Sequence, residues 1–112
     1  MSETVKSMIE VNYNKEFDTF IEVGKVYFFR AVTFHTIARV VALGHKELLC
    51  EDAVWVAVSE RWSDTVAKGL LREFESYVRN VPVVLMRDNI VDSFEWRHAI
   101  PTNTTPQTKE DK

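Results

Sequence analysis

The chain has 112 residues, of which 46% are hydrophobic and 28% charged, and its formal net charge at pH 7 is −3. This composition is ordinary for one soluble globular domain, and the acidic balance argues against non-specific nucleic-acid binding over the whole surface. Cys50 is the single cysteine, no apolar run approaches the roughly 20 residues that span a bilayer, and the N-terminus has no leader pattern, so we expect a cytoplasmic protein without disulfides or membrane contact.

The first 23 residues predict a helix and a lead-in to a sheet. Apolar residues recur at steps of three, four or one, which is the helical period: Val5, Met8, Ile9, Tyr13, Phe17, Phe20 and Ile21. Ser2 is a suitable N-cap, and Glu3 suits the first turn. We expect a short helix over Glu3–Glu10 and a looser segment after it.

From Gly24 the composition changes to valine, tyrosine and phenylalanine, which favour strands. Two apolar runs flank the turn Gly44-His45-Lys46-Glu47, and this pattern predicts a hairpin. The pair Glu51-Asp52 then separates the second run from a third. The expected strands are Lys25–Thr33, Arg39–Leu43, Leu48–Cys50 and Val54–Val58. The first turn falls near Phe34-His35-Thr36, or one long bent strand runs through it.

The second half of the chain predicts a helix and two more strands. Ser63-Asp64 begins an apolar pattern at helical spacing, which predicts a helix over Asp64–Ser76. Val81–Met86 and Ile90–Trp96 are expected strands around the turn Arg87-Asp88-Asn89, with Pro82 at a strand start or edge. Pro101–Lys112 has no apolar anchor and is expected to be disordered. The domain organisation is therefore a lead-in over 1–23, a β domain over 24–100 with a helical insertion at 59–80, and a tail over 101–112.

No residue pattern indicates catalysis. His35, His45 and His98 are far apart and lack metal-ligand spacing, and Cys50 lies in an apolar run that indicates a core thiol. Glu51 and Asp52 point to opposite faces if they lie on a strand, so they cannot easily act as an acid pair. No glycine-rich phosphate loop is present. We expect no enzyme activity, no metal and no cofactor.

The strand Val26-Tyr27-Phe28-Phe29 is apolar on both faces, whereas a sheet in so small a domain normally has one face in water. This pattern indicates that both faces are covered, by a neighbouring subunit, a helix or a ligand.

A helix followed by five strands, with a long hairpin in the middle, resembles the Sm-like small β-barrel, which is one of the SH3-like barrels. The segment A-L-G-H-K-E-L-L-C-E-D-A, Ala42–Ala53, is similar to the end of the family's first motif, of the type L-x-L-x-D-A. The segment V-L-M-R-D-N-I-V-D-S-F-E-W, Val84–Trp96, is similar to its second motif, in which an Arg-Gly pair follows three apolar residues. The resemblance implies a mainly β, five-stranded barrel with a short N-terminal helix, assembled into a homo-oligomeric ring.

The sequence departs from the family at the positions that hold RNA. The family has an asparagine where this chain has Glu47, and a glycine where it has Asp88; only Arg87 is retained. A carboxylate at Glu47 repels phosphate and has no donor for a base. The exposed Arg87 is expected to pair with Asp88, Asp92 or an acid of a neighbouring subunit.

The leading hypothesis is therefore a non-enzymatic structural or scaffolding module that forms a homo-oligomer, such as a small phage-type or bacterial accessory protein, with a further protein partner left open. Unpaired strand edges supply the physical basis, because the edge of one subunit can pair with the opposite edge of the next. The expected interface residues are Val83, Leu85, Ile90, Phe94, Trp96 and Phe28. The alternative is an RNA- or single-strand-binding ring that uses Lys46, Arg87, Phe34 and His45.

Overall fold

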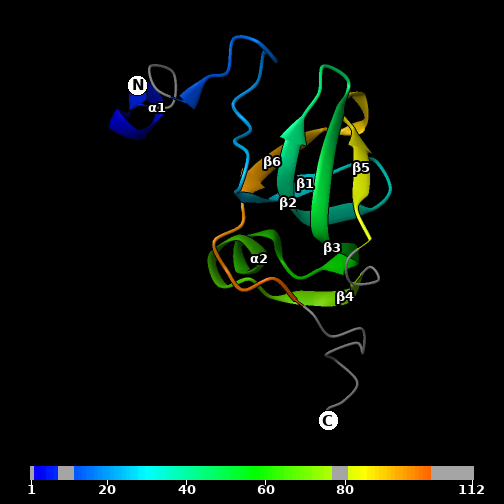
Figure 1. Ribbon diagram of the computed structural model, residues 1–112. Coiled ribbons are helices and arrows are strands. Elements are labelled where there is room, and N and C mark those ends of the chain that lie inside the picture. Colours follow the sequence, from blue (N-terminus) through cyan, green and yellow to red (C-terminus); the bar gives the residue numbers. More distant parts are fainter. Residues whose placement is uncertain (1, 8–11, 77–80, 102–112) are drawn as a thin grey trace.

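The computed structural model describes residues 2–7, 12–76 and 81–101, and its strands form one antiparallel sheet (Figure 1). In chain order the elements are α1 (Glu3–Ser7), β1 (Val26–Arg30), β2 (His35–Leu43), β3 (Glu47–Ser59), α2 (Trp62–Lys68), β4 (Leu71–Ser76), β5 (Val83–Met86), the 3-10 helix η2 (Arg87–Asn89) and β6 (Asp92–Glu95). The prediction of a mainly β fold is confirmed; the sheet has six strands, whereas the Sm-like resemblance implies a five-stranded barrel.

The order of the strands is β4-β3-β2-β1-β6, and β5 also pairs with β3. β3 is long enough to hold two partners on the same edge: Glu47–Cys50 faces β5, and the stretch from Val54 to Ser59 faces β4. β4 and β5 therefore run one after the other along β3. Among the described residues the sheet stays open, because β6 pairs with β1 alone.

A bulge in β3 divides that strand into two halves. The register shifts by one residue between Ile37 and Arg39, opposite Glu51 to Val54, and Asp52 has a positive φ of 54°. Aspartate tolerates this left-handed conformation better than most residues do. The expectation of two separate strands on either side of Glu51-Asp52 is wrong, because the bulge bends β3 without ending it.

The bulge also moves the side chains of β3 from one face of the sheet to the other. Leu48 and Cys50 lie before it and belong to a first buried cluster with Tyr27, Phe29, Ala38, Val40 and Ala53. Val54 and Val56 lie after it and belong to a second cluster with Phe28, Ile37, Leu71, Phe74 and Trp96. β1 contributes to both clusters, so the two apolar faces of Val26–Phe29 are covered by the chain itself and need no partner.

The expected helix over Asp64–Ser76 is half right. α2 covers only Trp62–Lys68 and is capped by Gly69, whose φ of 72° is left-handed, and Leu71–Ser76 is the strand β4. Leu71 and Phe74 are buried against the second cluster, so sheet pairing overrides their helical spacing. Thr65 fixes α2: its hydroxyl accepts from the Glu60 N–H at 3.1 Å and donates to the Leu70 carbonyl at 2.9 Å.

The two ends of the chain differ in how they are held. α1 has no buried residue, so it does not cover the sheet, and the part of the expected helix over residues 8–10 lies outside the described residues. At the other end Ile100 packs against the second cluster, and the Ser76 hydroxyl donates to the Pro101 carbonyl at 3.0 Å. The rest of the expected disordered tail, residues 102–112, lies outside the described residues.

The remaining strand predictions hold in type and shift at their ends. β1 is shorter than Lys25–Thr33, and β2 begins at His35, so the first turn lies at residues 31–34. β5 begins at Val83, directly after Pro82, and β6 covers only the middle of the expected Ile90–Trp96.

Candidate functional site

The structure brings together two turns that are distant in the sequence, Gly44–Glu47 between β2 and β3 and η2 (Arg87–Asn89) between β5 and β6. The Arg87 N–H donates to the Lys46 carbonyl at 2.9 Å, which holds η2 against the turn between β2 and β3. The Arg87 guanidinium donates to the carbonyls of Gly44 at 2.9 Å and His45 at 3.2 Å through Nη1, and to that of Asp18 at 3.1 Å through Nη2. Arg87 thus links η2 to two other backbone segments, the turn at Gly44-His45 and the stretch at Asp18.

The expectation that Arg87 pairs with Asp88 or Asp92 is wrong. Asp92 pairs with Arg30, whose Nε lies 2.7 Å from Oδ1, because β6 places the two residues opposite each other on neighbouring strands. This pair lowers the pKa of the Asp92 carboxyl, chiefly through the hydrogen bond from Arg30.

The other residues of the nucleic-acid hypothesis do not converge around Arg87. Lys46 and His45 are exposed beside it, and the His45 ring lies 4.9 Å from that of Phe17. Phe34 precedes β2, whereas His45 and Lys46 follow it, so the strand separates them; the Phe34 ring packs on Trp55 at 4.6 Å. Among the described residues Lys46 makes no ion pair, and it lies next to two exposed carboxylates, Glu47 and Asp88.

The six residues expected at an oligomer interface pack against the interior of this chain. Phe28 is 0% exposed and Trp96 is 3% exposed, which corrects the expectation that they contact a partner. Val83, Leu85 and Ile90 are half-buried against the first cluster, and Phe94 against the second. The sequence correctly indicated the strands β5 and β6 at the edges of the sheet. On β5, however, the exposed apolar side chains are Val84 and Met86, whereas Val83 and Leu85 face the core.

Val84 and Met86 of β5, together with Leu49 of β3, form an exposed apolar surface, which we call the β5 patch. Leu49 lies directly opposite Val84 in the ladder of β3 and β5, and Val84 and Met86 share one face of β5. Val84 is 50% exposed and Met86 is 44% exposed. Within the described part of the chain no other strand pairs with the outer edge of β5.

The outer edge of β5 also presents backbone groups. Hydrogen bonds alternate along an antiparallel strand, and the Arg87 N–H points to β3, so Leu85 and Val83 also face β3. The N–H and C=O groups of Val84 and Met86 therefore point away from the sheet. Apolar side chains and open backbone groups coincide on these two residues.

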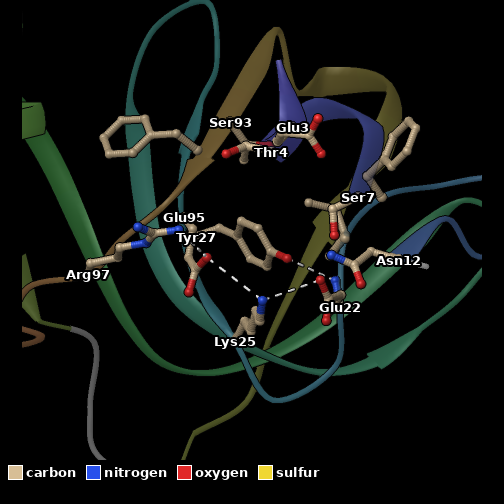
Figure 2. Close-up of a pocket in the computed structure, with 13 residues that line it drawn as sticks. Glu3, Thr4, Ser7, Asn12, Glu22, Lys25, Tyr27, Ser93, Glu95 and Arg97 are labelled. Carbon is tan, nitrogen blue, oxygen red and sulfur yellow. Dashed lines mark hydrogen bonds and ion pairs between the residues drawn. The ribbon is translucent and has the colours of Figure 1, made fainter. Parts of the chain in front are cut away.

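A pocket of about 840 Å³ lies at the opposite edge of the sheet, between β6 and residues 3–7 and 12–22, which we call the N-terminal segment (Figure 2). We call it the β6 pocket; its walls are Ser93, Phe94 and Glu95 of β6 on one side, residues of α1 and of the stretch from Asn12 to Glu22 on the other, and Lys25, Tyr27 and Arg97. Lys25 lies between two carboxylates, with Nζ 3.3 Å from Glu22 and 3.8 Å from Glu95.

Two groups of this pocket have shifted acidities. The hydrogen bond to Glu22, followed by the charge of Glu95, raises the pKa of Lys25. Burial raises the pKa of the Tyr27 phenol, whose oxygen accepts from the Glu22 N–H at 2.9 Å. Both groups stay protonated at neutral pH, so the pocket presents a fixed, mixed charge.

The other chemically reactive side chains lie apart from each other. Cys50 is fully buried, and burial raises the pKa of its thiol to about 12, which confirms the prediction of a core cysteine. His35 accepts from the Ala31 N–H and packs on Phe28, while His98 contacts the Val66 carbonyl at 3.0 Å. Among residues 2–7, 12–76 and 81–101, no three His, Cys, Asp or Glu side chains are grouped so that they could hold a metal ion.

Sequence reasoning missed both surfaces for identifiable reasons. All four residues of β5 are apolar, so the pattern cannot tell which alternate pair faces the core. The β6 pocket depends on the N-terminal segment lying beside β6, and these are far apart in the sequence. A signal existed only for Lys25 and Glu22, which lie three residues apart.

No helix in the described residues combines the length and the apolar character required to cross a membrane. Comparison of the chain with protein-family models, with curated proteins and with solved structures finds no match.

Proposed function

We propose that this chain is a non-catalytic assembly module that forms a homo-oligomer through β5. The observation that carries the proposal is the coincidence, at Val84 and Met86, of exposed apolar side chains with an open strand edge. An edge of this kind is a template for pairing with another chain, and folded proteins usually protect it with charge, proline or a covering element. Here Pro82 precedes the strand, and the strand itself is apolar.

The form of the oligomer follows from the two edges. An isologous dimer requires only that two β5 strands pair across a twofold axis. A closed ring of the Sm-like kind requires β5 of one subunit to pair with β6 of the next. The N-terminal segment lies beside β6 and forms the far wall of the β6 pocket, so we favour the dimer. The Sm-like relationship stays part of the proposal, supported by the pairing of β3 with both neighbours and by the two adjoining loops.

Mass measurement tests the assembly. By light scattering at micromolar concentration, the wild type should exceed the 13.0 kDa of one chain. Val84→Lys should shift it to the monomer, because a lysine on an edge strand blocks pairing. Val66→Lys is the matched control, since Val66 is 40% exposed on α2, and it should stay oligomeric. A 13.0 kDa wild type at every concentration would refute the proposal.

The competing function is single-stranded nucleic-acid binding at the Arg87 loops. Arg87 is occupied by three carbonyls, and Glu47 and Asp88 stand beside Lys46. We therefore expect no binding of labelled oligo-U at about 50 mM salt by fluorescence polarisation, where phosphate contacts are strongest. Micromolar binding that disappears in Lys46→Glu would reverse the order of the two hypotheses.

A further inference from the structure

The β6 pocket is bounded on one side by an open strand edge. β6 pairs with β1, and the Trp96 N–H donates to the Val26 carbonyl at 2.8 Å. Hydrogen bonds alternate along the ladder, so Phe94 shares the orientation of Trp96. The N–H and C=O groups of Ser93 and Glu95 therefore point away from β1, and both residues line the pocket.

The two faces of this edge differ in chemistry. Glu95 lies opposite Tyr27 and beside Lys25 and Glu22, so one face presents carboxylates, among them Glu22 and Glu95 (Figure 2). Phe94 lies opposite Phe28 on the other face, and their rings are stacked at 5.3 Å. A strand added to β6 would place alternate side chains next to carboxylates and next to an aromatic ring.

The charges of the pocket favour a cationic occupant. Its walls carry the carboxylates of Glu3, Glu22 and Glu95 against the cations Lys25 and Arg97. Both cations already contact Glu95, with Arg97 at 3.5 Å, and Glu3 has no ion-pair partner among the described residues. Three negative groups against two positive ones leave a net negative lining.

We propose that the β6 pocket binds an extended peptide segment of a partner protein, in which apolar and basic residues alternate. The peptide adds a strand to β6 through the backbone groups of Ser93 and Glu95, and the N-terminal segment forms the opposite wall. Its basic side chains lie along Glu95 and Glu22, and its apolar side chains lie along Phe94. This site is separate from the β5 patch, so it does not depend on the proposed mode of assembly.

The test measures, by fluorescence polarisation, the binding of a fluorescein-labelled peptide of alternating valine and lysine to the full chain. Ser93→Pro removes the outward N–H and leaves the bonds to β1, since that N–H does not face β1. We expect about fivefold to tenfold weaker binding, as for a lost hydrogen bond. Ser93→Ala keeps the N–H and should bind like the wild type, and circular dichroism confirms the fold of both.

The peptide itself supplies the second arm. Two versions carry N-methyl groups on either all valine or all lysine amides, and one of the two must lose the bonds to β6. A third version replaces lysine by glutamate and should not bind. Equal binding by both methylated versions and the parent would overturn the proposal, and so would undiminished binding to Ser93→Pro.

The arms also separate this site from self-assembly. Val84→Lys should bind the peptide with the affinity of the wild type, because β5 lies at the other edge of the sheet. If the peptide instead dissociates an oligomer of the wild type, β6 belongs to the self-contact and the proposal of a foreign peptide is wrong.

Discussion

The two halves of β3 are covered in different ways. Beyond the bulge, toward Ser59, the sheet has β4 alongside, and α2 and the C-terminal segment lie at this end of the molecule (Figure 1). Before the bulge, from Glu47 to Cys50, the strand pairs with β5, and its outer face carries the β5 patch. The half that pairs with β4 is enclosed by the chain itself and contributes to stability. The half that pairs with β5 has an exposed apolar surface and an open edge, and we propose that assembly takes place there.

The largest effect is expected where the C-terminal segment meets α2. A Cβ on Gly69 would lie 2.6 Å from Cγ of His98, and its φ of 72° is unfavourable for any L side chain. Gly69→Ala should lower the free energy of unfolding by about 2–5 kcal/mol. Gly24→Ala is the control: its φ is 95°, and nothing lies within 4 Å of the added Cβ, so it should cost only about 1–2 kcal/mol. Chemical denaturation measures both; equal losses would show that the His98 contact contributes nothing.

The second largest effect is expected at the bulge around Asp52, which joins the two halves of β3. Asp52→Val places a β-branched residue at a φ of 54° and removes the ion pair with Arg39, which should cost about 2–3 kcal/mol. Asp52→Asn retains tolerance of this conformation and should cost below about 1 kcal/mol. The bulge sets which face of the sheet Val54 and Val56 occupy. Amide hydrogen exchange should therefore increase in both halves of β3 in Asp52→Val, and in neither half in Asp52→Asn. Protection that changes on one side only would mean that the halves are independent.

Arg87 tests the open half of the sheet. Arg87→Met removes hydrogen bonds to the carbonyls of Gly44, His45 and Asp18 and should cost about 1–2 kcal/mol. Its effect should be confined to the first half, with faster amide exchange in β5 and at the ends of β2 and β3 and little change in β4. Arg87→Lys keeps the charge and loses the forked geometry, so it should recover only part of the loss. If Arg87→Lys were as stable as the wild type, the contribution of Arg87 would come from its charge and not from its forked geometry.

The smallest effect concerns His35, which begins β2 in the enclosed half. Burial, followed by the positive charge of Arg30, lowers the pKa of this histidine, while Asp92 opposes the shift. The folded state thus binds the proton less well than the unfolded state, so the contribution is complete above about pH 6.5 and is lost as the pH falls below it. His35→Gln should remove this part of the acid dependence, below about 1 kcal/mol between about pH 7 and 5.5. If the free energy of unfolding of His35→Gln changes with pH as steeply as that of the wild type, other groups cause the pH dependence.

Local pattern predicted much of the fold. The hairpin at Gly44–Glu47, the strand type of β1, the turn at Arg87–Asn89 and the buried Cys50 follow from residue types and spacing. The failures share a physical cause. Leu70, Leu71 and Phe74 have helical spacing, and only the edge of β3 makes Leu71–Ser76 a strand. Sheet pairing supplies hydrogen bonds and burial that outweigh a weak local preference.

The candidate site was predicted less well than the fold. The strands at the open edges were identified, but the interface residues Val83, Leu85, Phe94 and Trp96 turn inward. A strand whose residues are all apolar has no pattern to decide its face. The role of Arg87 was also missed, because its three acceptors are backbone carbonyls, which every sequence contains.

The sequence by itself determined that this is a mainly β domain with a central hairpin, because residue preferences and period-two patterns act over a few positions. Only the tertiary structure decided that β3 continues through Asp52, which side chains of β5 face solvent, and that the N-terminal segment encloses a pocket beside β6. Each of these depends on contacts between segments distant along the chain, and on the change of face that one extra residue in a strand imposes.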